Sequence, residues 1–226
     1  CSYTDGFAER YSPAYQEYYN YRGGNFPPAW PEILANNLGL DVENYGEGAS
    51  GNELIFHKFC RVADKLTKDD VVIIEWSHMN RFRWIDFKGN CWMQCSYSTQ
   101  DENISLRTAQ EVVNVRTHEL FLTAIDEYEN IINTLAKLIG FEIYYWAVDT
   151  TILQRRTKEN NQSYLDLNHI VYKDYTIFRE VKNRGGLSIS EETNNQVNDN
   201  HFGEVAHKIM SDIFYDEIIK RRNKNN

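Results

Sequence analysis

The chain has 226 residues, of which 42% are hydrophobic and 14% aromatic, and its formal net charge at pH 7 is −9. A chain of this size can bury one sizeable core, so the sequence predicts a single domain over residues 1–226. The acidic charge disfavours nucleic-acid binding, which requires a basic face. No apolar run approaches the roughly 20 residues of a membrane span.

The first third of the chain predicts two helices and one strand. Residues 7–29 are polar and rich in Tyr, which is typical of a long loop or insertion. Residues 30–38 have apolar side chains at helical spacing, and Gly39 follows as a helix stop. Residues 41–46 predict a short strand that leads into the glycine-rich GEGASGN. A second amphipathic helix follows and extends to Lys65.

The middle of the chain predicts two buried strands around a long helix. The run DVVIIEW at 70–76 is continuously apolar from Val71 to Ile74, as in a strand covered on both faces. Residues 77–108 read as an irregular insertion. Apolar residues step by three and four over 109–139, which predicts a helix, and FEIYYWAV at 141–148 predicts the second strand.

The last third predicts short helices and one long terminal helix. Residues 153–200 are mostly polar, whereas 203–221 form an amphipathic pattern with four apolar residues expected to face inward: Val205, Ile209, Ile213 and Phe214. Strands that alternate with helices predict a mostly parallel α/β sheet.

The four cysteines are Cys1, Cys60, Cys91 and Cys95. Their spacing is no disulfide framework for a chain this long. Cys91 and Cys95 could share a metal, but no second close pair of Cys or His accompanies them. We therefore expect free thiols, no metal site, no cofactor and a cytoplasmic location.

Three unusual polar segments follow predicted strands or precede the last helix. They are NYGEGASGN, EWSHMNR and NDNHF, and a fourth, CSYTDG, would join them if a strand preceded Cys1. Sites in open parallel sheets form at the carboxyl ends of the strands. These segments are therefore the candidate site.

CSYTDG, WPEILANNLGLDVENYGEGASGNELI and DNHFGEVAH together resemble the SGNH or GDSL-type hydrolases. The resemblance covers the first sixty and the last thirty residues, with a looser fit of strand order between them. It implies a three-layer α/β/α sandwich with a flavodoxin-like sheet, whose first strand would lie upstream of Cys1. It also implies a serine hydrolase that cleaves an ester.

The resemblance assigns the catalytic roles. Ser2 would be the nucleophile, His201 its general base and Asp199 the carboxylate that orients the imidazole. The simpler interpretations are that Ser2 is a turn hydroxyl and that Asp199 caps the last helix. His207 lies within that helix, where we expect a structural role.

The oxyanion hole would use the Ser2 backbone N–H and a backbone N–H of Gly48 or Ala49. The family's third donor is an Asn in a Gly-x-Asn-Asp block, which EWSHMNR lacks. Ser77 occupies roughly that position and Asn80 lies three residues further on. Both are candidate donors.

The candidate substrate contacts are Asn52, Trp76 and Arg81, and the aromatic loops favour a small polar ester such as an O-acylated sugar. Alternatively, Arg81 and Trp76 belong to a surface patch, and Asn52 bonds the backbone near Ser2 or caps a helix. The glycine-rich loop matches neither nucleotide-binding pattern, although its N–H groups could bind an anion.

Two other functions stay open. The missing Gly-x-Asn-Asp block leaves room for a non-catalytic binding domain on the same fold. If Cys1 is instead a mature N-terminus, it could be lipidated or act as a nucleophile. The sequence does not indicate an oligomeric state.

Overall fold

The computed structural model describes residues 6, 13–48, 50–78, 81–85, 91–95, 118–148, 152 and 177–225. Its contacts divide the chain into two compact units, which are Cys1–Gly48 with Leu165–Asn226 (unit 1) and Ala49–Tyr164 (unit 2). The single domain over residues 1–226 stays a prediction. No helix in the described ranges has an apolar stretch long enough to cross a membrane.

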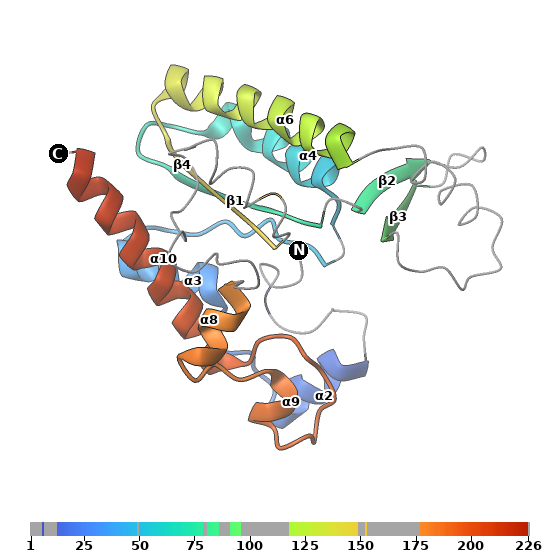
Figure 1. The fold of residues 1–226 in the computed structure, drawn as a ribbon. Coiled ribbons are helices and arrows are strands. Elements are labelled where there is room, and N and C mark those ends of the chain that lie inside the picture. Colours follow the sequence, from blue (N-terminus) through green and yellow to red (C-terminus); the bar gives the residue numbers. More distant parts are fainter. Residues whose placement is uncertain are drawn as a thin grey trace. The chain divides into compact units, whose positions relative to one another are not determined.

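Unit 2 contains a parallel strand pair. Strand β1 (Val71–Trp76) pairs with β4 (Glu142–Ala147), in a register that runs from Val71 opposite Glu142 to Trp76 opposite Ala147. Helices α4 (Asn52–Val62) and α6 (His118–Ile139) lie on the same face of this pair (Figure 1). A short 3₁₀ turn, η1 (Ala63–Lys65), follows α4. Parallel strands with helices confirm the predicted α/β class in its coarse form.

The core of unit 2 lies between these two strands and the two helices. Trp76 is fully buried, stacks on Tyr145 with ring centroids 6.2 Å apart, and donates its indole N–H to Glu129 Oε1 on α6 at 2.8 Å. Phe56 on α4 stacks on Tyr128 on α6, with centroids 4.3 Å apart. Both predicted strands and both helices are confirmed over their described residues.

Unit 2 also contains an antiparallel hairpin that the sequence analysis missed. Strand β2 (Arg81–Ile85) pairs with β3 (Cys91–Cys95). The prediction of an irregular 77–108 is therefore wrong for these two segments, and the rest of that range lies outside the described residues. Along a strand, Cys91 and Cys95 lie about 13 Å apart. One metal ion or one disulfide therefore cannot join them.

Unit 1 contains five helices in the described part of the chain. They are α2 (Pro13–Tyr21), α3 (Trp30–Leu38), α8 (Ile177–Asn183), α9 (Ile189–Glu192) and α10 (Glu204–Asn225). Helix α10 packs against α3 and α8 (Figure 1). Trp30 of α3 and Phe214 of α10 pack edge to face, with their ring centroids 4.8 Å apart.

The end of α3 is confirmed, because Gly39 adopts a left-handed conformation with φ of 71° and closes the helix. The prediction that 7–29 is all loop is wrong for α2, whose inward side is carried by aromatic residues. Tyr18 is fully buried there, and Tyr15 packs against Phe26 with ring centroids 4.7 Å apart. A Tyr side chain is polar only at its hydroxyl and can pack its ring inward, so the helical spacing of α2 does not stand out as an apolar stripe in the sequence.

The predicted strand at 41–46 is also absent from the described structure. The side chain of Asn44 accepts a hydrogen bond from the N–H of Gly46 at 2.9 Å. Such a local side-chain bond bends the backbone and competes with strand pairing. This stretch is therefore an extended loop with a turn at its end.

The inward face of α10 differs from the predicted one. Ile213 and Phe214 are buried as expected, whereas Val205 is 45% exposed. The buried stripe instead begins with Ala206 and Met210, one position further round the helix. This rotation places His207 in the core.

Candidate functional site

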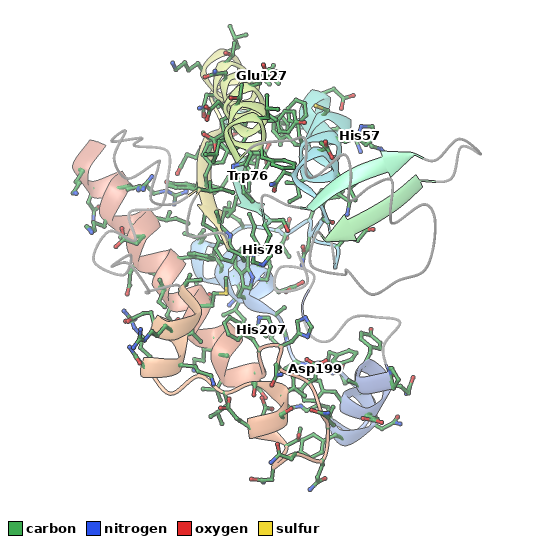
Figure 2. All side chains as sticks on the ribbon, turned by 45° about the vertical axis from the view of Figure 1, so that its right-hand side comes forward. His57, Trp76, His78, Glu127, Asp199 and His207 are labelled. Carbon is green, nitrogen blue, oxygen red and sulfur yellow. The ribbon has the colours of Figure 1, made fainter. Side chains whose placement is uncertain are left out.

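Asp199 and His201 lie together in the loop that leads into α10. His201 Nδ1 lies 2.6 Å from Asp199 Oδ1, and the same oxygen accepts the backbone N–H of His201 at 2.7 Å. The Asp199 side chain is 8% exposed and that of His201 is 23% exposed. Figure 2 shows Asp199 in this loop. The two residues therefore form a partly buried carboxylate–imidazole pair.

The electrostatics of the pair fix which atoms carry protons. Burial alone would raise the pKa of Asp199, but hydrogen bonds from the ring and the backbone N–H of His201, together with the charge of His201, lower it below its ordinary value. The carboxylate is therefore ionised at neutral pH and can only accept. Nδ1 must then donate, so the lone pair of the neutral ring lies on Nε2.

A short stretch of strand-like pairing holds the loop that carries the pair. Ser188 and Phe202 form an isolated antiparallel bridge. The N–H of Ile189 donates to His201 O at 2.8 Å, and the N–H of Gly203 donates to Leu187 O at 2.9 Å. The backbone of His201 is thus fixed on the residues that open α9.

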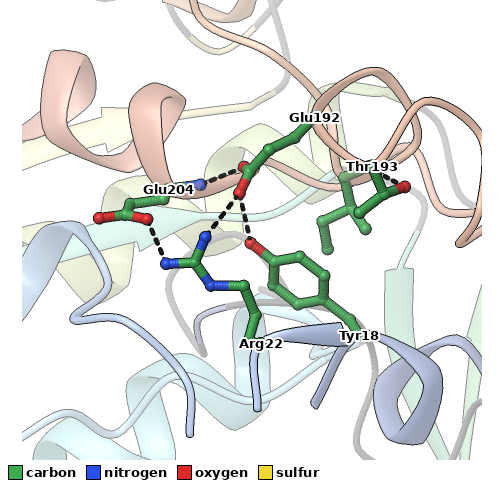
Figure 3. Close-up of polar contacts among 6 residues, drawn as sticks. Tyr18, Arg22, Glu192, Thr193 and Glu204 are labelled. Atoms are coloured by element: carbon green, nitrogen blue, oxygen red, sulfur yellow. Dashed lines mark hydrogen bonds and ion pairs between the residues drawn. The ribbon is translucent and has the colours of Figure 1, made fainter. Parts of the chain in front are cut away.

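Glu192, at the end of α9, connects three helices of unit 1 (Figure 3). Its Oε1 accepts Tyr18 Oη–H at 3.1 Å and pairs with Arg22 Nη1 at 3.2 Å, and its Oε2 accepts the N–H of Glu204 at 2.7 Å. Arg22 also pairs with the carboxylate of Glu204. Burial, and then the charge of Glu192, raise the pKa of Tyr18, so the phenol stays a donor.

His207 lies on α10 and is fully buried (Figure 2). Its Nδ1 accepts the backbone N–H of Trp30 at 3.2 Å. Burial lowers the pKa of His207 to about 3, the charge of His201 acts in the same direction, and a backbone hydrogen bond with Gly6 opposes them. The ring is therefore neutral and structural, as predicted.

Several predicted site residues cannot be placed. Ser2, Ala49 and Asn80 lie outside the described residues, and Arg81 is described only as the first residue of β2. Gly48 lies in a turn at the end of its segment of unit 1. Their assigned roles stay predictions.

Asn52 and Ser77 contact each other in unit 2. Asn52 Oδ1 accepts the N–H of Ser77 at 2.7 Å, and its Nδ2 donates to Ser77 O at 3.3 Å. Both residues are buried. The amide of Asn52 thus binds the backbone at the end of β1 by two hydrogen bonds, a role that the sequence analysis did not predict.

Trp76 requires a correction. Its side chain is fully buried and its indole N–H is bonded to Glu129. The sequence predicts a substrate contact for Trp76 because it is an aromatic residue at the end of a strand. Alternation along β1 places it on the face covered by α6, so we do not carry it into the proposed site.

The described residues contain no group of three or more His, Cys, Asp or Glu side chains that could hold a metal ion. A comparison with known protein families, characterised proteins and solved structures finds no match for this chain. The resemblance to the SGNH hydrolases therefore depends on the sequence motifs quoted above.

Proposed function

We propose that this protein is a serine hydrolase of the SGNH type that cleaves a small polar ester, such as an O-acylated sugar. Ser2 is the nucleophile, His201 the general base and Asp199 the residue that orients the ring. The observation that carries the proposal is the contact between Asp199 Oδ1 and His201 Nδ1 at 2.6 Å. A carboxylate on Nδ1 leaves Nε2 basic, which is what a serine hydroxyl requires.

The buried Gly6 supports the choice of Ser2. Gly6 has φ of 130° and a backbone hydrogen bond with His207, six residues after His201. Four residues of chain span at most about 14 Å, so covalent geometry limits the distance between Ser2 and Gly6 to that value. The hydroxyl is therefore tethered to the unit that carries the imidazole.

The proposed reaction has two acyl-transfer steps. Ser2 Oγ attacks the ester carbonyl carbon while His201 Nε2 takes its proton, and the protonated ring then gives that proton to the departing alcohol. Water, deprotonated by His201, attacks the acyl-serine, and the proton returns to Ser2 Oγ as the acid leaves. The lowered pKa of Asp199 suits a carboxylate that stays ionised throughout.

The oxyanion donors belong to the proposal as predicted from the sequence. They are the backbone N–H groups of Ser2 and of Gly48 or Ala49, with a side chain from Ser77 or Asn80. The N–H of Ser77 already donates to Asn52, so the hydroxyl is the group that Ser77 would contribute. Arg81 is kept as a substrate contact. We further propose the three-layer α/β/α sandwich with a flavodoxin-like sheet as the complete fold.

The burial of Ser77 favours a second candidate, a non-catalytic binding domain. Ser77 has no exposed surface. By the sequence resemblance it stands roughly where SGNH hydrolases carry the Asn donor of the Gly-x-Asn-Asp block. Losing one such donor costs about 100-fold in rate, so a protein without it could bind an ester and leave it uncleaved. Ester turnover separates the two candidates.

The test is hydrolysis of p-nitrophenyl acetate by the full chain and by Ser2→Ala, His201→Asn and Asp199→Asn. We expect each variant to lose about 1,000-fold or more in kcat, because the three groups act as one unit. His57→Asn changes an exposed histidine on α4 and should leave turnover unchanged. A folded wild-type protein that does not turn over esters would favour the binding domain.

A further inference from the structure

Ser190 is buried in α9, and both its N–H and its hydroxyl bond to the backbone of Asp199. Its N–H donates to Asp199 O at 2.9 Å, its hydroxyl donates to the same oxygen at 2.8 Å, and the N–H of Asp199 donates to Ser190 Oγ at 2.7 Å. We propose that Ser190 is a positioning residue that holds Asp199 so that its carboxylate meets His201 Nδ1. The inference deepens the proposed function and rests on it for its catalytic consequence.

The support for Ser190 is itself rigid. Helix α9 begins with a capping box in which Ser188 Oγ accepts the N–H of Glu191, and the carboxylate of Glu191 accepts the N–H of Ser188 at 2.7 Å. Backbone and side-chain bonds from Ser188, and one from Lys182, lower the pKa of Glu191 to about 2, so the box persists at neutral pH. The other end of α9 is fixed by Glu192.

The hydroxyl of Ser190 both accepts a hydrogen bond from the backbone of Asp199 and donates one to it. The N–H of Asp199 needs an acceptor and its carbonyl takes a donor, and a single oxygen supplies both. Alanine would remove both bonds and leave the Asp199 N–H without this acceptor. The bond from the Ser190 N–H to Asp199 O would remain. The N–H of Asp199 would lose its anchor, so the carboxylate of Asp199 would be held less firmly against the ring of His201.

Thr193 offers a matched control in the same helix turn. Its hydroxyl is fully buried, donates to Ile189 O at 2.8 Å and accepts the N–H of Val197 at 3.1 Å. Thr193→Val therefore removes a comparable buried hydroxyl that bonds the same loop, but not the backbone of Asp199. A general loosening of the loop would affect both variants alike.

The test is the tautomer of the His201 ring, read from its ¹⁵N chemical shifts at the end of a pH titration where those shifts no longer change and report a neutral ring. The His201→Gln spectrum identifies the signals. We expect the Nδ1–H form in the wild type and in Thr193→Val. In Ser190→Ala we expect a shift toward the Nε2–H form, which free imidazole side chains favour. If Ser190→Ala does not fold, Ser190→Cys takes its place in the test. Its thiol forms only weak hydrogen bonds, so we expect a tautomer shift in the same direction.

Turnover gives the catalytic half of the test. If the protein is a hydrolase, Ser190→Ala should lose about 100-fold in kcat with KM little changed, since displacing a reacting group by about 1 Å has that cost. If the wild-type protein shows no turnover but Ser190→Ala shows the expected tautomer change, the proposed hydrolase activity is wrong and the positioning role stands. An unchanged tautomer in both Ser190 variants, or an equal change in Thr193→Val, overturns the positioning role.

Discussion

The imidazole of His207 accepts the backbone N–H of Trp30, although 177 residues separate the two in the sequence. Trp30 is the first residue of α3, and the preceding Ala29 offers no side-chain cap. Helix N-termini leave backbone N–H groups without intrahelical partners. His207 supplies the missing acceptor from α10, and so fastens the start of α3 to the helix that follows the loop of Asp199 and His201.

Replacing His207 should destabilise unit 1. His207→Phe keeps a ring of similar size but leaves the N–H of Trp30 buried without its acceptor, which costs about 1–3 kcal/mol in the free energy of unfolding. Urea unfolding followed by circular dichroism measures the change. His57→Phe, at an exposed position, should change it by less than about 0.5 kcal/mol. Equal effects in the two variants would contradict the capping role.

The free energy of unfolding should decrease as the pH is lowered, because of the titration of His207. The unfolded chain binds a proton at His207 near its ordinary pKa of 6.5, whereas burial lowers the folded-state pKa to about 3. As the pH falls between these values, the unfolded state binds more protons, so the free energy of unfolding decreases by up to about 1.4 kcal/mol per pH unit. Above pH 6.5 this contribution is constant.

The check is to measure unfolding free energy from about pH 8 to about pH 4.5 in the wild type and in His207→Phe. Below about pH 6.5, the slope of the unfolding free energy against pH reports how many protons are taken up on unfolding. In His207→Phe this number should be smaller by nearly one. The stabilisation from Asp199, whose folded-state pKa is lowered, is present above its unfolded pKa and lost below it, near about pH 4. An identical slope in both proteins would show that His207 titrates normally in the folded state.

Gly203 should not tolerate a side chain while Glu192 keeps its contacts. A Cβ at this position would clash with Glu192 Oε2, so the carboxylate would have to leave the N–H of Glu204. We expect Gly203→Ala to cost about 1–3 kcal/mol, the range for a lost buried hydrogen bond to a charged group. Chemical denaturation measures this cost.

A double-mutant cycle with Glu192→Ala isolates the cause. Removing the carboxylate makes room for the new methyl group, so the cost of Gly203→Ala should be smaller in the Glu192→Ala background, with an interaction energy of about 0.5–3 kcal/mol. Additive effects would mean that the clash is relieved elsewhere. The Tyr18 and Arg22 contacts of Glu192 shown in Figure 3 are lost in that background and cancel in the cycle.

Asn52 should affect stability more than substrate binding. Asn52→Leu has nearly the same shape but leaves the N–H of buried Ser77 without its acceptor, and we expect a loss of about 1–3 kcal/mol in unit 2. Hydrogen exchange at the end of β1 reports the loosening. If the variant is as stable as the wild type and only KM rises, Asn52 is the substrate contact that the sequence predicted.

The regular elements of the fold were predictable wherever one periodicity dominated. The strand at 71–76 is almost continuously apolar, and the helix before Gly39 has both an apolar stripe and a stop signal. The hairpin was missed although Arg81, Phe82, Arg83 and Trp84 alternate in the manner of a strand and a Gly-Asn pair precedes Cys91. Its alternation was read as aromatic loop chemistry.

The candidate site was predictable only where a motif named its residues. The resemblance named Asp199 and His201, and the structure brings them within hydrogen-bonding distance. Ser190 and Glu192 were missed because their partners are backbone groups and distant helices. The sole sequence signal was the Ser-x-x-Glu capping pattern at 188–191, which marks the helix and not its role.

The most direct measurement of the central claim is labelling by a fluorophosphonate probe, which reacts with an activated serine hydroxyl. We expect the full chain to be labelled on the peptide that contains Ser2, as read by mass spectrometry, and we expect no label in Ser2→Ala or His201→Asn. A folded wild-type protein that takes up no label, or one that is labelled at another residue, would contradict the proposed hydrolase.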